Sequence, residues 1–291
     1  MLKRLLLALA VALAASEASA QTKVSRGLKI NADGAIRIYN LVGSVRVIGW
    51  NRDSVLVRGT LGKGNNLHMG GGGAGMKMFI EGIDERNPAP ADIEVSVPMR
   101  ARVWVKTATA SIEVSGVAGS LDLYVVGGNI KVTGNPADVN AEAIDGSITI
   151  VGSPAWVRAK SASGDVSLNG SSSDVTVSTV SGKIDVEGGR YEKAKFESVT
   201  GNIRFAGSFE RGGLANFDTH GGTIEVGIPK GNDADFEVVS IAGKVTNRLT
   251  SSRPVAGRYG RGSELNTTAG IGGTRVVIKS FKGPVTLLRK D

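Results

Sequence analysis

Two carboxylates near the middle of the chain are the residues best suited to acid–base chemistry. Asp122 and Glu142 lie in consecutive segments that alternate apolar and polar residues, so a sheet would place them as diagonal neighbours on its outer face. Hydrolysis of a glycosidic bond needs two carboxyl groups about 5 to 9.5 Å apart, which a diagonal can provide. Arg158 and Lys160 fall in the next segment, and cross-strand ion pairs with them explain the carboxylates without catalysis. We therefore predict no catalytic residue and keep a carbohydrate-active enzyme, acting on polysaccharide through this pair, as the alternative.

The two histidines offer little for catalysis or metal binding. His68 and His220 lie far apart in the sequence, and the chain has no cysteine. A structural zinc site takes four ligands, mostly from Cys and His. We predict no metal site, and we expect His220 to be a partly buried corner residue, because its repeat position elsewhere holds apolar residues, namely Val126, Ile144, Val180, Val199 and Ile241.

A glycine-rich stretch, residues 61–75, raises the question of a nucleotide cofactor. Gly70, Gly72 and Gly75 have the spacing of a dinucleotide-binding fingerprint. That fingerprint needs a helix N-terminus directly after it to hold the phosphates, but residues 76–81 alternate as a strand does. We predict a flexible loop over residues 61–75 and no cofactor.

Two aromatic side chains offer binding rather than catalysis. Trp104 lies between two valines and Tyr124 follows a leucine, so the alternation directs both rings away from the core. Exposed rings on a rigid wall can stack on a sugar or contact a partner protein, since interfaces are enriched in aromatic residues. We predict that Trp104 and Tyr124 form the binding site. The alternative is that residues 61–75 fold over the two rings as a lid.

A repeat in the middle of the chain positions all of these residues. The pattern Gly-x-Ile/Val-x-apolar returns at Ala110, Gly128, Gly146, Gly164, Gly182, Gly201, Gly222 and Gly243, first in steps of 18 residues and later in steps of 19 or 21. A fixed short period is the signature of a repeat architecture. Between the glycines, apolar and polar residues alternate over short runs rich in β-branched side chains, which predicts half-buried strands.

A column of small residues precedes each of these corners by three positions. Its members, most of which carry a hydroxyl, are Thr107, Val125, Ala143, Ser161, Thr179, Ser198, Thr219 and Ser240. The alternation places the column on the inner side, so we predict a stack whose hydroxyls bond the turning backbone or one another.

The repeat predicts an all-β chain folded as a single-domain parallel β-solenoid with rungs of about 18 residues. Regular rungs should span residues 103–246, with irregular capping segments at both ends. The template returns in residues 276–287 after an irregular excursion over residues 247–266. A rung of this length encloses only a thin core, so function must lie on the outer faces.

The first residues predict export. Lys3 and Arg4 precede an apolar run over residues 5–15, and Ala18-Ser19-Ala20 supplies the small residues of a cleavage site before Gln21. We predict a signal peptide over residues 1–20, a β-solenoid domain over residues 21–291, and a protein of the periplasm, the cell surface or the medium. No other segment is long and apolar enough to span a membrane.

The charge balance bears on the partners. The formal net charge is +8, with 35 basic and 27 acidic residues of both signs scattered along the chain. A positive surface attracts anionic polymers weakly, but no nucleic-acid-binding motif is present, so we predict no nucleic-acid partner.

Three phrases of the repeat resemble a known family. Ser163-Gly164-Asp165-Val166, Ser181-Gly182-Lys183-Ile184 and Thr200-Gly201-Asn202-Ile203, with the opening Gly43-x-Val45-x-Val47-x-Gly49-Trp50, are similar to the bacterial putative-adhesin family of unknown function. Its members are Gly-rich β-strand-repeat proteins, akin to the head domains of autotransporter adhesins. The resemblance covers about residues 36–287. It implies a β-solenoid and an exported or envelope protein, with no established catalytic residues.

Together these patterns predict a non-enzymatic exported β-solenoid protein for adhesion, envelope organisation or polymer binding. Its expected partner is a cell-surface polysaccharide or an envelope protein. Besides the carbohydrate-active enzyme, a purely structural periplasmic spacer is a third possibility. The patterns leave the ligand, the handedness of the coil and the oligomeric state open.

Overall fold

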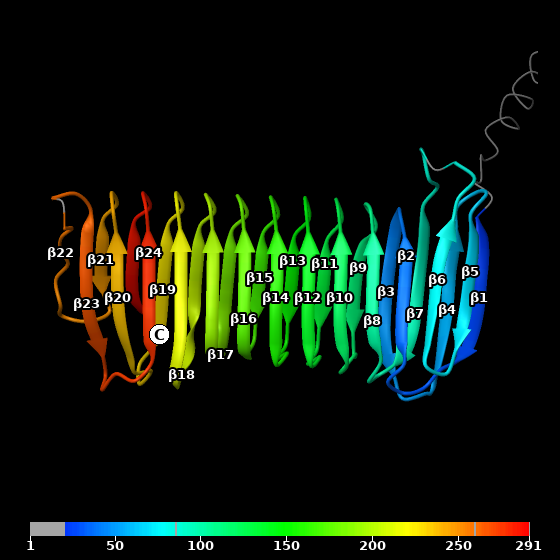
Figure 1. Cartoon of the computed structure of the whole chain (residues 1–291), viewed down its shortest axis with the longest axis horizontal. Coiled ribbons are helices and arrows are strands. Elements are labelled where there is room, and N and C mark those ends of the chain that lie inside the picture. Colours follow the sequence, from blue (N-terminus) through cyan, green and yellow to red (C-terminus); the bar gives the residue numbers. More distant parts are fainter. Residues whose placement is uncertain (1–20, 85, 259, 291) are drawn as a thin grey trace, which may run out of the picture.

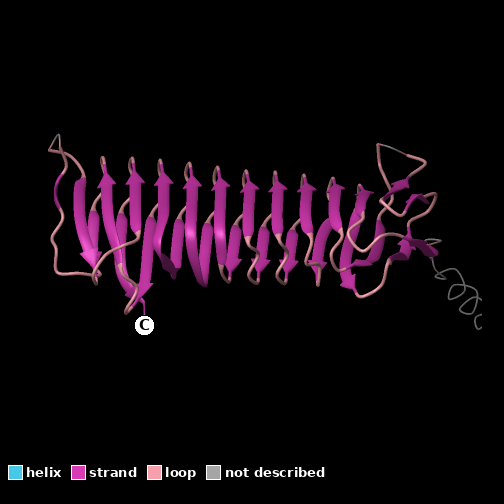
Figure 2. Cartoon of the chain, turned by 60° about the horizontal axis from the view of Figure 1, so that its bottom comes forward, coloured by secondary structure: helices cyan, strands magenta, loops and turns pink. Residues whose placement is uncertain are grey.

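Strands make up most of the folded chain. The computed structural model describes residues 21–84, 86–258 and 260–290, and within them no residue is helical (Figure 2). All 25 strands belong to one sheet, so the prediction of an all-β, solenoid-like chain is confirmed. The predicted signal peptide, residues 1–20, lies outside the described residues.

The strands follow one another along the chain with short connections. They are β1 (Thr22–Lys29), β2 (Ala35–Asn40), β3 (Gly43–Trp50), β4 (Ser54–Leu61), β5 (Asn66–Gly72), β6 (Gly75–Glu81), β7 (Ala91–Pro98), β8 (Arg102–Thr107), β9 (Ser111–Ser115), β10 (Ser120–Val125), β11 (Ile130–Thr133), β12 (Asp138–Ala143), β13 (Ile148–Val151), β14 (Trp156–Ser161), β15 (Val166–Asn169), β16 (Ser172–Thr179), β17 (Ile184–Ser198), β18 (Ile203–Thr219), β19 (Ile224–Pro229), β20 (Ala234–Ser240), β21 (Val245–Arg248), β22 (Val255–Ala256), β23 (Ser263–Ala269), β24 (Arg275–Ser280) and β25 (Val285–Lys290).

Two walls of parallel strands run along the long axis (Figure 1). Wall A contains β2, β8, β10, β12, β14, β16 and the second halves of β17 and β18. Wall B contains β3, β9, β11, β13, β15, the first halves of β17 and β18, and β19. Equal repeat positions pair directly, as Leu121 does with Val139 and Val139 with Val157. Because β17 and β18 run through both walls, the two walls form one sheet.

The space between the walls is filled by side chains. Along most strands of the two walls, every second residue points inward and is buried. Where the rungs lengthen to 19 and 21 residues, the core also holds aromatic rings, at Tyr191, Phe196, Phe205, Phe209 and Phe217. Phe205 and Phe209 stack with ring centroids 4.8 Å apart, and the Tyr191 hydroxyl donates a hydrogen bond of 2.5 Å to the Gly170 carbonyl. The core is therefore packed along its length, which leaves the outer faces for binding.

The predicted ladder of hydroxyls lies at one corner of the coil and is buried there. Thr107 Oγ1 donates to the carbonyl of Ala110 over 2.7 Å. Thr179 Oγ1 donates to the carbonyl of Gly182 over 2.7 Å and lies 2.9 Å from Ser198 Oγ, from which it can accept a hydrogen bond. These bonds satisfy backbone groups where the chain turns from wall A to wall B. The prediction that the hydroxyls bond the turning backbone is confirmed.

The amino-terminal end departs from sequential stacking. Strand β2 lies between β6 and β8, and β3 lies between β7 and β9. The pair β6–β7 lies nearer the amino-terminal end of the solenoid, and β8–β9 lies nearer its middle. Strands β1, β4 and β5 pair antiparallel with their neighbours. The Gly-rich residues predicted as a flexible loop instead include β5, which forms a hairpin with β6, so that prediction is wrong.

The carboxyl-terminal end shows a similar insertion. Strand β24 pairs with β18 on one side and β20 on the other, and β25 pairs with β19 and β21. The last rung of the sequence is therefore an inner rung of the structure (Figure 1). Stacking of consecutive repeats would place Gly243 directly on Gly222. That expectation is wrong, because Gly283 lies between them.

No helix in the described ranges is long and apolar enough to cross a membrane. Within the same ranges, no group of three or more His, Asp or Glu residues is arranged to hold a metal ion.

Candidate functional site

Five aromatic side chains lie in a row on adjacent strands along the outer face of wall A. The aromatic strip consists of His68, Phe79, Tyr39, Trp104 and Tyr124, from the neighbouring strands β5, β6, β2, β8 and β10. The ring centroids of His68 and Phe79 lie 4.7 Å apart, those of Tyr39 and Trp104 also 4.7 Å, and those of Trp104 and Tyr124 5.9 Å. His68 is exposed and the other four are half-buried, so the strip is open to a ligand.

The structure bears out the predicted geometry of the two rings. Trp104 pairs with Asp122, and Tyr124 pairs with Lys106, so Trp104 and Tyr124 are diagonal neighbours on one face. The predicted lid over them is wrong, because β5 extends wall A edge to edge and does not cover it.

Sequence reasoning missed the other three members of the strip. Strand β2, which carries Tyr39, lies between β8 and β6, so Tyr39 contacts Trp104 and Phe79 follows one strand further out. One signal was available, since Tyr39 follows Ile36 and Ile38 in the repeat template and so points outward.

Four cations surround the aromatic strip. They are Arg37, Lys77, Arg102 and Lys106, all exposed on β2, β6 and β8. The Lys77 ammonium lies 5.0 Å from the ring centroid of Tyr39 and 5.5 Å from that of Phe79, in range for cation–π attraction. None of the four forms an ion pair with another described residue. We call them the cation set.

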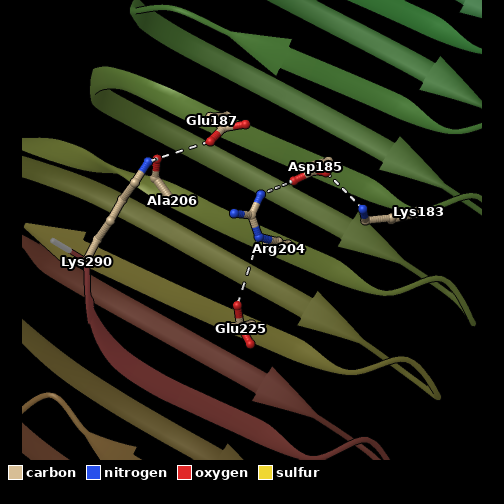
Figure 3. Close-up of polar contacts among 7 residues, drawn as sticks. All are labelled: Lys183, Asp185, Glu187, Arg204, Ala206, Glu225 and Lys290. Atoms are coloured by element: carbon tan, nitrogen blue, oxygen red, sulfur yellow. Dashed lines mark hydrogen bonds and ion pairs between the residues drawn. The ribbon is translucent and has the colours of Figure 1, made fainter.

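On wall B, charged side chains form ion pairs with neighbours of opposite sign (Figure 3). Asp185 pairs with Lys183 at 2.8 Å and with Arg204 at 2.9 Å, and Arg204 also reaches Glu225 at 4.0 Å. Burial alone raises the pKa of Asp185, but hydrogen bonds from Lys183 and Arg204 outweigh it and hold the pKa below its usual value. Alternating signs on adjacent strands thus neutralise each other here.

Acidification should weaken wall B at Asp185. Its folded pKa lies below the unfolded value of about 3.9, so its contribution to stability is present above that value and is lost as the pH falls through the folded pKa. Urea unfolding should show that Asp185→Asn lowers the midpoint at pH 7 and that the difference from wild type shrinks at pH 3. Asp174→Asn is the control, since its carboxylate accepts no side-chain hydrogen bond within the described residues. Equal differences at both pH values would contradict the assignment.

The two candidate carboxylates are separated by an amide. Asn140 Nδ2 donates to Asp122 Oδ1 over 3.2 Å and to the Tyr124 hydroxyl over 2.9 Å. Burial, followed by the charges of Asp122 and Glu142, raises the pKa of Tyr124. Lys160 lies directly opposite Glu142, as the expected cross-strand charge pairing requires. Within the described residues, however, no ion pair within 4.0 Å joins either carboxylate to Arg158 or Lys160. Asn140 is the partner that holds Asp122.

A shallow groove of about 510 Å³ runs along the edge of wall A. Its floor is the small-residue column, one bank includes Glu142 and Lys160, and the other is an apolar ridge at the corner of the coil. The ridge residues are 43% to 58% exposed and are Leu41, Val126, Ile144, Val180, Val199, Phe281 and Ile241. His220 lies in the same ridge and stacks on Phe281 at 4.7 Å. It is exposed, so its expected partial burial is wrong, because the whole ridge faces solvent.

The chain is similar to three solved structures described as adhesion or binding proteins. A putative adhesin from Bacteroides fragilis NCTC 9343 is 11% identical, covering 92% of this chain and 97% of that chain, with a TM-score of 0.43. A putative lipid binding protein from Parabacteroides distasonis ATCC 8503 is 13% identical, covering 93% and 97%, with a TM-score of 0.46. A putative cell adhesion protein from Clostridium sporogenes ATCC 15579 is 10% identical, covering 92% and 100%, with a TM-score of 0.24.

Comparison with curated proteins gave no match. A family model described as Toastrack DUF4097 matches residues 119–270, more than half of the 291 residues. The match runs from just before β10 to just after β23 and so covers most of both walls. The chain belongs to the Toastrack DUF4097 family.

Proposed function

We propose that this protein is an exported, non-enzymatic adhesion protein that binds an extended surface glycan along wall A. The aromatic strip supports the proposal, because five rings on adjacent strands make a platform where sugar faces can stack. In this proposal residues 1–20 are removed and residues 21–291 form one parallel β-solenoid domain, capped at both ends, in the periplasm or on the cell surface. The domain needs no cofactor.

The strip is suited to a long ligand rather than a small one. Neighbouring strands lie about 4.8 Å apart, so rings on five strands extend on the order of 20 Å along the solenoid axis. The hydrogen-bonded strands hold the rings in place before the ligand arrives, which lowers the entropy lost on binding. A polymer that lies along the axis would meet successive rings.

Binding is favoured over catalysis by the surroundings of the candidate carboxylates. Asp122 already accepts a hydrogen bond from Asn140, and Glu142 lies on the bank of the groove, which Asp122 does not line. A glycosidase instead needs both carboxyl groups to flank the same scissile bond. Asp122 and Glu142 therefore fit a polar wall better than a catalytic pair.

Replacing both predicted binding residues should weaken glycan binding strongly and leave the fold intact. In the Trp104→Ser, Tyr124→Ser double variant we expect glycan affinity to fall at least about tenfold, because each stacked ring contributes roughly 1 kcal/mol. Isothermal titration with dextran, polygalacturonate and dextran sulfate measures the affinity, and thermal unfolding checks the fold.

Trp156→Ser is the matched control, since this tryptophan is also on wall A, is 36% exposed and lies outside the aromatic strip. It should bind as wild type does. Strong destabilisation of the double variant would show that the two rings belong to the core. Unchanged affinity would place the binding site elsewhere.

A further inference from the structure

The cation set around the aromatic strip carries unneutralised charge. Arg37 and Lys77 occupy directly opposite positions on β2 and β6. Like charges directly opposite across two strands destabilise a sheet. Neither residue has an acidic partner among the described residues, so this arrangement costs stability in the free protein.

The same chain avoids this cost on wall B. There, directly opposite positions carry Asp185, Arg204 and Glu225 in turn, so each charge faces one of opposite sign. The opposed pair of Arg37 and Lys77 therefore leaves positive charge unneutralised at this end of wall A, where an anionic ligand could balance it.

Each central ring of the strip has a cation as its direct cross-strand neighbour. Arg37 pairs with Trp104, and Lys106 pairs with Tyr39 on one side and Tyr124 on the other. A sugar whose face lies on a ring therefore has a cation within reach of an acidic substituent. A guanidinium can hold a carboxylate or a sulfate through two parallel hydrogen bonds.

We propose that the ligand of wall A is an acidic polysaccharide, whose sugar rings stack on the aromatic strip while its carboxylate or sulfate groups meet the cation set. This inference rests on the proposed function and adds the charge of the ligand to it. Acidic residues adjoin the strip towards both ends. Glu81 is engaged by His68 at 2.7 Å, while Asp122, opposite Trp104, is engaged by Asn140. Glu142 lies opposite Tyr124. Tyr39, in the middle of the strip, has no acidic cross-strand neighbour, so an acidic ligand meets least repulsion there.

A glycan fits this face better than a nucleic acid. The cation set occupies only three strands, β6, β2 and β8, and the acids Asp122 and Glu142 follow on β10 and β12. Single-stranded nucleic acids are held by a positive groove that tracks a charge at every nucleotide. A short cationic patch bounded by acids suits a polymer with more widely spaced charges.

Charge-neutral variants of the opposed pair test the proposal. We expect the Arg37→Gln, Lys77→Gln double variant of the full protein to bind polygalacturonate and dextran sulfate about tenfold or more weakly than wild type, with a shallower salt dependence. Binding of neutral dextran should not change, and thermal stability should be equal or higher because the repulsion is relieved. A preference of wild type for polygalacturonate or for dextran sulfate identifies carboxylate or sulfate as the group recognised.

Arg253→Gln, Arg258→Gln is the matched control. It removes the same net charge from the opposite end of the solenoid, and both arginines are exposed. This control should bind as wild type does. An equal loss in the control, or tighter binding of neutral dextran than of either acidic polymer by wild type, would overturn the proposal. Tighter binding of an oligothymidylate than of both acidic polymers would overturn it as well.

The outcomes separate this inference from the proposed function. Suppose that the Trp104→Ser, Tyr124→Ser variant loses binding while the Arg37→Gln, Lys77→Gln variant does not. The protein then binds a glycan without recognising its charge, and only the inference fails. If wild type binds none of the three polysaccharides, both fail.

Discussion

Removing residues 275–290 should unfold the carboxyl-terminal part of the protein, because this segment is an inner rung. Its strands β24 and β25 each pair with a strand on both sides, and the inward side chains Val276, Ile278, Val285 and Leu287 are fully buried. Burying one such side chain contributes about 1.5–3 kcal/mol, so the four together contribute on the order of 6–12 kcal/mol. That is comparable to the whole stability of a typical domain, about 5–15 kcal/mol.

A deletion of similar size inside the regular region should be tolerated. Removing residues 146–163 joins two equivalent corners and brings β12 beside β16 and β11 beside β15, in the register that β14 and β13 had with them. Far-UV circular dichroism and urea unfolding should show a folded protein one rung shorter. Removing only residues 146–154 should misalign both walls and is the control. A 275–290 truncation that unfolds at the wild-type midpoint would show that the inner rung is dispensable.

A methyl group at Gly164 should be strongly damaging to the regular rungs. The Cβ of an alanine there would lie 2.1 Å from the carbonyl oxygen of Gly146 and 2.7 Å from the backbone nitrogen of Ser147. Both contacts are with backbone of the neighbouring rung, so relief requires the rungs to separate and their hydrogen bonds to lengthen. We expect Gly164→Ala to cost about 3 kcal/mol or more.

Gly127→Ala provides the matched control, because its nearest contact would be Thr109 Cγ2 at 3.6 Å, an ordinary van der Waals distance. It should change stability by less than about 1 kcal/mol. Chemical denaturation of both variants measures the difference. Similar costs for the two substitutions would mean that rung spacing at Gly164 is more adjustable than the structure indicates.

The sequence predicts the rungs well because the same columns repeat in every one. Buried pairs such as Leu121 with Val139 follow directly from the 18-residue step, and the hydroxyl of Thr107 follows from its inward position before a corner. The order of the outermost rungs along the axis does not follow, since any two rungs with the same columns can stack. Only pairing partners such as β23, which runs antiparallel to β20, distinguish the alternatives.

Part of the candidate site can be predicted from the sequence, and part cannot. Trp104 and Tyr124 come from consecutive regular rungs, so their contact is predictable from the period. Tyr39 and Phe79 join them only after the terminal rungs exchange places, and His68 lies beside glycines that have no side chains to show a strand pattern. The members of the aromatic strip that the sequence did not predict are therefore those whose positions depend on the order of the rungs.

The inserted rung also bears on how the chain matures. Strands β20 and β21 are synthesised before β24 and β25, and the repeat template lets them dock directly on β18 and β19 while the later strands are absent. Admitting the last rung then requires that premature contact to open, so we expect a slow final folding step whose rate depends on undocking β20. Once closed, residues 275–290 are clamped between two neighbours and do not fray as an outermost rung would. The stack of rungs can therefore be completed only after the chain has been made through residue 290.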